Sequence, residues 1–174
     1  MLTSDKIALA LGRNKKALSL RPTMGQGTAV TRVRVRDDLT CDVEDGRWKL
    51  TVGMSEKSGG AGAGPDPGVC GRSAMGTCVA LSYVMWASEA GVPIESLEVE
   101  VRADYDVRGE YGLDENVPPT YRAMSWVVTV SSPAPEADVM RVLDQADAHS
   151  SWLQMVLKPQ QANREVRFTQ TTEG

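Results

Sequence analysis

The sequence lacks the charge excess and the long apolar runs that mark several protein classes. With a formal net charge of -4, the chain has no broad basic face for nucleic acid or an anionic membrane surface. Its N-terminal apolar run covers only residues 7–11, which is too short for a signal-peptide core or a membrane span. We therefore expect a cytoplasmic protein whose partners include neither nucleic acid nor a membrane.

Cysteine and histidine are also scarce. The 174 residues contain three cysteines, Cys41, Cys70 and Cys78, which is typical of free thiols in a reducing compartment and not of a secreted disulfide framework. The only histidine, His149, and cysteine spacings of 29 and 8 residues fit no zinc pattern. No Gly-x-Ser-x-Gly motif is present either. We predict neither a metal nor another cofactor.

The length and the 41% hydrophobic content favour one domain over residues 1–174. Residues 1–27 are predicted to form a peripheral N-terminal arm, mostly an amphipathic helix. Residues 30–52 alternate in polarity around Asp45-Gly46, which predicts an antiparallel meander with a tight hairpin. The glycine- and proline-rich residues 58–68 match neither a P-loop nor a dinucleotide-binding motif, so a plain loop is expected.

The second half of the chain alternates between strand and helix patterns. Residues 97–107 have a strict period of two, which predicts a strand with one solvated face, and residues 123–130 are its expected antiparallel neighbour. A helix opened by prolines is expected to run to about residue 148, followed by a short helix at 151–157. Residues 165–171 are predicted as a last strand.

The most informative segment is residues 64–91, which predicts a long helix that is apolar on nearly every side. Cys78 lies in its middle, and on residue chemistry alone it is either an inert buried thiol or a reactive one. If Cys70 and Cys78 are both helical, they are separated by about 12 Å along the axis, beyond the reach of a disulfide. A bond between them requires Cys70 on a non-helical lead-in that folds back.

The order of these segments resembles the OsmC/Ohr family. The resemblance runs from about residue 28 to 170 and is most specific from Gly64-Pro-Asp-Pro67 through Cys78 to Gly91. It implies an α+β, OsmC-like fold with curved antiparallel sheets packed on two long central helices. It also implies an intertwined homodimer with its sites at the subunit interface.

The resemblance further implies thiol-dependent reduction of organic hydroperoxides. Cys78 matches the family's peroxidatic cysteine, and Arg36 is a loose match to its activating arginine. The chain departs from the pattern at two positions. Gly68-Val69 stands where a glutamate is expected, and residues 150–152 contain no second cysteine.

Two functions follow as expectations. In the first, the chain is a one-cysteine peroxidase in which Cys78 reduces a small apolar hydroperoxide and is resolved by an external dithiol reductant or by Cys70. In the second, the chain is a noncatalytic protein that binds a small hydrophobic ligand at the dimer interface, with Trp152 at the site of the lost cysteine. A purely structural interaction module is a third alternative. The predicted pocket walls are Met75, Leu81, Met85 and Trp152.

Overall fold

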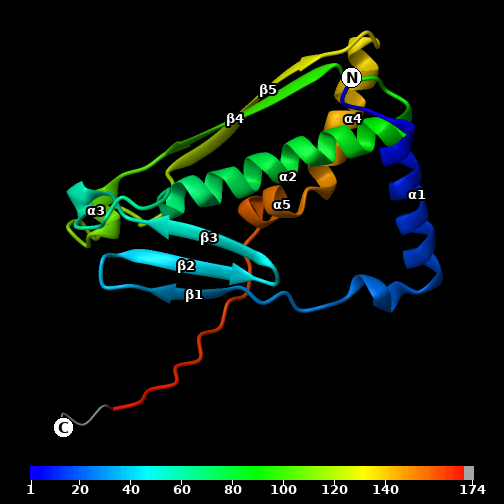
Figure 1. The fold of residues 1–174 in the computed structure, drawn as a ribbon. Helices are drawn as coiled ribbons and strands as arrows, with labels where there is room; N and C mark the ends of the chain where they lie inside the picture. Colours follow the sequence, from blue (N-terminus) through cyan, green and yellow to red (C-terminus); the bar gives the residue numbers. More distant parts are fainter. Residues whose placement is uncertain (171–174) are drawn as a thin grey trace.

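The computed structural model describes residues 1–170 of the chain (Figure 1). It combines helices with two antiparallel sheets, as the sequence predicts. The elements in chain order are α1 (Asp5–Leu20), η1 (Pro22–Gly25), β1 (Arg32–Val35), β2 (Thr40–Asp45), β3 (Trp48–Gly53), η2 (Glu56–Ser58), α2 (Pro67–Ala90), β4 (Ser96–Asp104), α3 (Val107–Glu110), β5 (Ala123–Ser131), α4 (Glu136–His149) and α5 (Ser151–Leu157).

Helix α2 is the central element, and its ends follow from local sequence. The Asp66 side chain caps the N-terminus by accepting the Val69 N–H at 2.8 Å, and Pro67 occupies the first turn. Gly91 ends the helix in the left-handed conformation, with φ of 67°, as the Gly-Val-Pro sequence predicts. One face of α2 is buried at four-residue intervals, by Met75, Val79, Tyr83 and Ala87.

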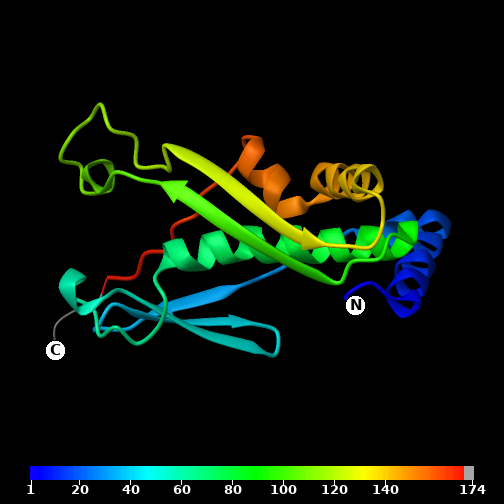
Figure 2. The same ribbon diagram turned by 90° about the horizontal axis from the view of Figure 1, so that it is seen from above.

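The two-stranded sheet of β4 and β5 lies along α2 and covers part of its buried face (Figure 2). Its register pairs Ser96 with Ser131 and Asp104 with Ala123, so the predicted antiparallel pairing is confirmed. The predicted extension of β4 to residue 107 is wrong. The Asp106 side chain accepts the Arg108 N–H and starts α3 at Val107, which ends the extended conformation.

Helix α4 packs on α2 and is tied to it by a polar network in the core. The Tyr83 hydroxyl donates to Asp147 Oδ1 at 2.7 Å and accepts from Trp126 Nε1 at 3.2 Å. Burial raises the pKa of Tyr83 and also that of Asp147, although the bond from Tyr83 opposes the shift of Asp147. The network therefore joins α2, α4 and β5 through the buried Tyr83 hydroxyl and two half-buried partners, Asp147 and Trp126.

The meander of β1, β2 and β3 has one charged and one apolar face. The predicted hairpin is confirmed, because Asp45 pairs with Trp48 across Gly46, which has φ of 54°. On the charged face Glu44 forms ion pairs with both Arg34 and Lys49. Much of the apolar face is exposed to solvent. That apolar face consists of Val33, Val35, Cys41, Val43, Trp48, Leu50 and Val52.

The N-terminal arm packs on the C-terminal part of α2. Ser4 N–H donates to Ser88 Oγ at 3.2 Å, and Lys15 pairs with Glu89 while its ammonium lies 4.1 Å from the centre of the Trp86 ring. After α5 the chain extends away from the body (Figure 1). The predicted strand is wrong over residues 165–170, which have no neighbouring strand to pair with, and residue 171 lies outside the described residues.

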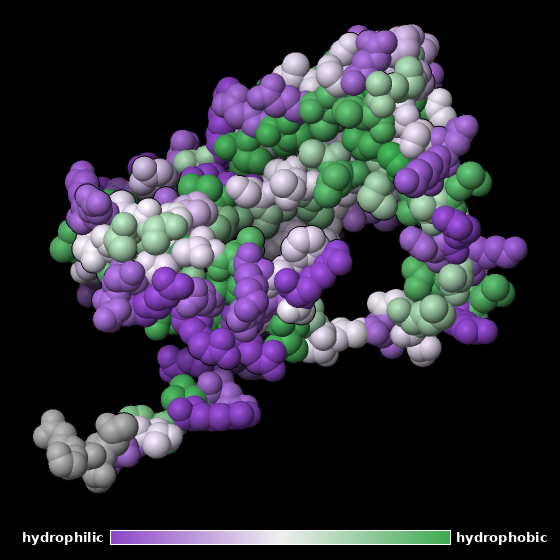
Figure 3. All heavy atoms as spheres, in the orientation of Figure 1, coloured by the Kyte–Doolittle hydropathy of each residue, from purple (hydrophilic) through white to green (hydrophobic). Residues whose placement is uncertain are grey.

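The chain exposes far more surface than a compact monomer of its size. Its accessible surface is 13336 Å², against roughly 8,300 Å² expected for a folded monomer of this mass. The extended C-terminal segment contributes part of the excess, and the apolar face of the meander contributes another part. Figure 3 shows hydrophobic side chains gathered on one face of the molecule, along the path of α2.

Candidate thiol site

The Cys78 thiol lies where the middle of α2 meets the start of α5. Ser150 Oγ donates to Cys78 Sγ at 3.4 Å, and Ser151 Oγ lies 3.7 Å from the same sulfur. Ser150 is only 1% exposed, so its hydroxyl is held in place by packing. Two neutral donors therefore surround the sulfur on the side of α5.

Ser150 and Ser151 reach the thiol because the chain changes direction between α4 and α5. Ser150 ends α4 and is also the N-cap residue of α5, and its carbonyl accepts the Gln154 N–H at 2.8 Å. The first N–H groups of a helix have no partner within the helix. Those of Ser151 and Trp152 lie on the side of Cys78 and contribute to lowering the pKa of its thiol.

Hydrogen bonding lowers the pKa of the Cys78 thiol below its ordinary value. Burial is the largest single influence and acts in the opposite direction, since it favours the neutral thiol. The side chain of Ser150, the N–H of Trp152 and the donors of Ser151 together outweigh burial. The largest influences that lower this pKa are hydrogen bonds from neutral groups, and they favour the thiolate, the nucleophilic form of cysteine.

The structure does not bring the predicted helper Arg36 to the thiol. Arg36 follows β1 and forms a two-point ion pair with Asp42, with Nε 2.9 Å from Oδ2. This hydrogen bond raises the pKa of Arg36 and lowers that of Asp42. A role for Arg36 beside Cys78 stays a prediction that a single chain does not test.

The suggested resolving thiol, Cys70, lies within α2 together with Cys78. The non-helical lead-in that a bond between them requires is therefore absent, and the eight-residue spacing places the two residues about 12 Å apart along the axis. All three cysteines are free thiols of intermediate exposure. An internal disulfide from Cys70 would require the first turns of α2 to unfold.

The predicted pocket walls divide into two groups. Met75 is part of the buried core, whereas Leu81, Met85 and Trp152 are exposed, Leu81 to 64%. Cys78, Leu81 and Met85 follow one another at helical spacing and share a face of α2. Together with Trp152, they form an apolar surface that is open on the solvent side of the thiol.

Gly68 stands at the position where the resemblance implies a glutamate, and three polar side chains lie close to it. A Cβ atom on Gly68 would lie 3.0 Å from Asp66 Oδ1, 3.1 Å from Arg72 Nη1 and 3.3 Å from Tyr121 Oη. Glycine at this position lets these three polar groups approach the helix backbone. A side chain at this position would require these flexible groups to shift by a few tenths of an ångström.

Other classes of site find little support in the described residues. Within residues 1–170, no group of three or more histidine, cysteine or acidic side chains is arranged to hold a metal ion. Across the same residues, no helix is both long and apolar enough to cross a bilayer.

The resemblance implies that residues 150–152 stand where a second cysteine is expected, and it gives Ser150 and Ser151 no part in activating the thiol. The available signal is a pair of serines directly before an apolar helical segment, which is typical of a helix N-cap. The missing information is that this N-cap faces Cys78, a residue more than 70 positions earlier.

The described residues therefore define an α+β protein in which two antiparallel sheets surround a central helix that carries a thiol. The family model described as OsmC-like protein matches residues 59–163, which is more than half of the chain. The chain therefore belongs to the OsmC family.

Solved structures show the same fold at low sequence identity. An OsmC-like protein from Mycoplasma pneumoniae is 11% identical, with a TM-score of 0.66 and coverage of 77% of this chain and 90% of that one. An organic hydroperoxide resistance protein OsmC from Legionella pneumophila is also 11% identical, with a TM-score of 0.56 and coverage of 75% and 89%. A search of curated proteins gives no match.

Replacing Ser150 by alanine is expected to raise the pKa of the Cys78 thiol, because the thiolate loses a hydrogen-bond donor. The rate of Cys78 alkylation by iodoacetamide, followed by peptide mass spectrometry against pH, should then reach its midpoint at a higher pH than in the wild type. Ser19→Ala on α1 is the matched control and should leave the midpoint unchanged. An unchanged midpoint in Ser150→Ala would contradict the assigned role.

Proposed function

We propose that the chain is a one-cysteine thiol peroxidase that reduces small, apolar organic hydroperoxides through Cys78. The observation that carries the proposal is the pair of hydroxyls at the Cys78 sulfur, with Ser150 Oγ donating at 3.4 Å and Ser151 Oγ lying at 3.7 Å, beside a pKa lowered toward the nucleophilic form. The description of the Legionella relative as a hydroperoxide resistance protein supports the same chemistry. The exposed apolar side chains beside the thiol suit an apolar substrate.

The reaction balances with an external dithiol. The Cys78 thiolate attacks one peroxide oxygen, the O–O bond breaks, and the alkoxide takes up a proton to leave as an alcohol. The sulfur, now a sulfenic acid, is attacked by one thiol of the reductant, which releases water and forms a mixed disulfide. The second thiol of the reductant then attacks this mixed disulfide. Cys78 is released as a thiolate, and the reductant leaves with an internal disulfide. This need for a thiol reductant is our reason for proposing a reducing, cytoplasmic location.

Brief treatment with cumene hydroperoxide in the presence of a sulfenic-acid trap is expected to label Cys78 rapidly. Intact-mass spectrometry should show one added trap molecule in the wild type and in Cys70→Ser, and none in Cys78→Ser. Labelling that is absent in the wild type, or that survives Cys78→Ser, would overturn the proposal.

Cysteine in place of Ser151 is expected to provide the missing resolving thiol. Ser151 Oγ lies 3.7 Å from Cys78 Sγ and Ser151 is exposed, so a sulfur at this position is within reach after a small adjustment. Oxidation of the Ser151→Cys variant should join Cys78 to the introduced thiol in a disulfide, seen as a cross-linked peptide, and should suppress trapping of the sulfenic acid. Ser19→Cys on α1 is the control and should form no such link.

We also propose that two copies of the chain assemble into a homodimer. The large accessible surface and the exposed apolar face of the meander support assembly. So does the open apolar surface at Cys78, Leu81 and Met85. Covering these side chains gains about 25 cal/mol for each Å² of apolar surface removed from water. In such a dimer the partner would close the open side of the thiol site.

Glutamate in place of Leu50 is expected to weaken the dimer, because it puts a charge on the apolar face of the meander. Sedimentation equilibrium should show a dimer for the wild type and a shift toward monomer for Leu50→Glu. Lys49→Glu puts the same residue on the opposite, charged face and should remain dimeric. A monomeric wild type, or equal behaviour of both variants, would contradict this assignment.

A noncatalytic role in binding a small hydrophobic ligand is the second candidate. It is favoured by one observation, the exposure of Trp152, Leu81 and Met85 on the two helices that meet at the thiol. The two candidates separate in the trapping experiment. A thiol that does not react with hydroperoxide, in a protein that binds an apolar ligand with a change in tryptophan fluorescence, would favour the binding role.

A further inference from the structure

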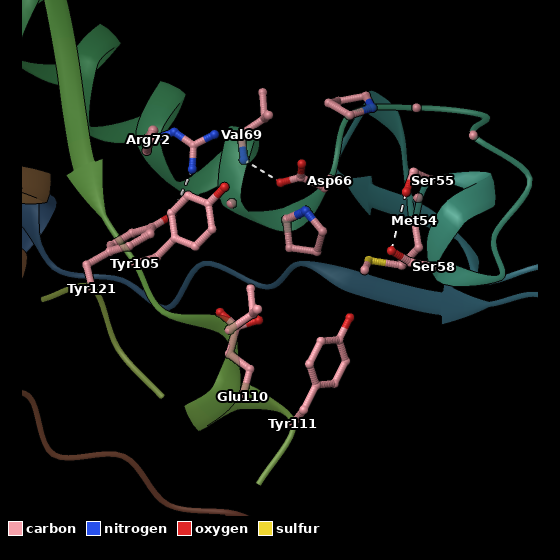
Figure 4. Close-up of a pocket in the computed structure, with 17 residues that line it drawn as sticks. Met54, Ser55, Ser58, Asp66, Val69, Arg72, Tyr105, Glu110, Tyr111 and Tyr121 are labelled. Atoms are coloured by element: carbon pink, nitrogen blue, oxygen red, sulfur yellow. Dashed lines mark hydrogen bonds between the residues drawn. The ribbon is translucent and has the colours of Figure 1, made fainter. Parts of the chain in front are cut away.

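A separate cleft of about 730 Å³ lies at the N-terminal end of α2 (Figure 4). Cys78 is not among the residues that line it, so it is distinct from the thiol site. Its walls come from four segments: the chain after β3, the first turns of α2, the segment from Tyr105 to Tyr111, and Tyr121. A volume of this size falls within the range of small-molecule sites.

Arg72 is the cation of this cleft. Its Nη1 donates to the Tyr121 hydroxyl at 3.0 Å, and among residues 1–170 no carboxylate lies within ion-pair distance of its guanidinium. A guanidinium has five N–H donors and binds carboxylates at two points. The absence of a side chain at Gly68 leaves Arg72 and Tyr121 close to the helix backbone. Arg72 therefore keeps donors available for an anionic group.

The aromatic lining indicates the body of the ligand. Only 5% of the chain is aromatic, yet three of its four tyrosines line this cleft. Figure 4 shows Tyr105, Tyr121 and Arg72 on one side of the opening, with Met54, Ser55 and Ser58 on the other. Tyr111 is 65% exposed, which leaves ring surface free for contact. Such walls favour a flat, largely apolar ligand body.

The acidic lining limits the charge of the ligand. The carboxylates of Asp66 and Glu110 also line the cleft, and Asp66 is engaged in capping α2. One cation beside two anions limits the ligand to a single negative charge, which pairs with Arg72, since a second negative charge would be repelled. A phosphate dianion therefore fits the cleft less well than a monocarboxylate.

We propose that this cleft binds a small organic acid with one carboxylate and an aromatic body, the carboxylate pairing with Arg72 and the body contacting Tyr105 and Tyr111. The site does not depend on the chemistry proposed for Cys78. It adds a binding function at one end of the helix that carries the thiol.

Calorimetric titration of the full chain at low salt tests the proposal with three probes. The probes are 4-phenylbutyrate, the uncharged 4-phenylbutanol, and inorganic phosphate. Phenylbutyrate should bind at least tenfold more tightly than the alcohol, because a hydrogen-bonded charge pair is worth more than about 1.4 kcal/mol, or tenfold in affinity. Phosphate should give no measurable binding.

Variants then locate the site. Arg72→Gln should weaken phenylbutyrate binding at least tenfold, and Tyr111→Ala, at an exposed position, should also weaken it. Arg13→Gln on the exposed face of α1 is the matched control and should bind as the wild type does. Cys78→Ser should bind normally, which separates this site from the thiol site.

Three outcomes would overturn the proposal. The first is equal binding of the acid and the alcohol, and the second is full binding in both Arg72→Gln and Tyr111→Ala. The third is the absence of phenylbutyrate binding at millimolar concentration by wild-type protein. Circular dichroism of Arg72→Gln shows whether that variant is folded, and Tyr111→Ala decides the question if it is not.

Discussion

Helix α2 is apolar around most of its circumference, and no single neighbour in the chain covers all of it. Val79 and Tyr83 face α4 and the β4–β5 sheet, and the arm covers the C-terminal part of the helix. Leu81 and Met85 remain open, and fully burying each such side chain is worth about 1.5–3 kcal/mol. The incomplete cover that leaves Cys78 accessible is therefore also the strongest physical reason for a second copy of the chain.

The thiol is activated by neutral groups, which makes its environment compatible with an apolar surface. A charged activator such as Arg36 would have to be desolvated to act beside Leu81, and Arg36 is instead paired with Asp42. Hydroxyl and backbone donors cost less to desolvate because they carry no net charge, and Ser150 is already buried. Closing the site with a partner would strengthen both burial and the hydrogen bonds, two effects that oppose each other on the pKa of Cys78.

Patterns of local origin could be predicted from the sequence. The Asp45-Gly46 hairpin and the Gly91 cap depend on residues close in the chain. The alternation of apolar and polar residues along β4 follows from the burial of one face of the strand. The same alternation continues to Val107 and predicts a strand that is too long, because Asp106 caps a helix that begins at Val107. Cys78 was found from its apolar helix, but its donors were not assigned, since they reach it only when α5 packs against α2.

The departure of this chain from the family pattern at Gly68 has a structural counterpart. A side chain at that position would fill the space now shared by Asp66, Arg72 and Tyr121. Among the described residues Arg72 donates to the Tyr121 hydroxyl and forms no ion pair, so a cation with free donors stands at the edge of an aromatic cleft. The same glycine therefore marks the departure from the family pattern and lets Arg72 and Tyr121 lie close to the helix backbone. The helix consequently separates two roles along its length, with binding proposed at its start and thiol chemistry at its middle.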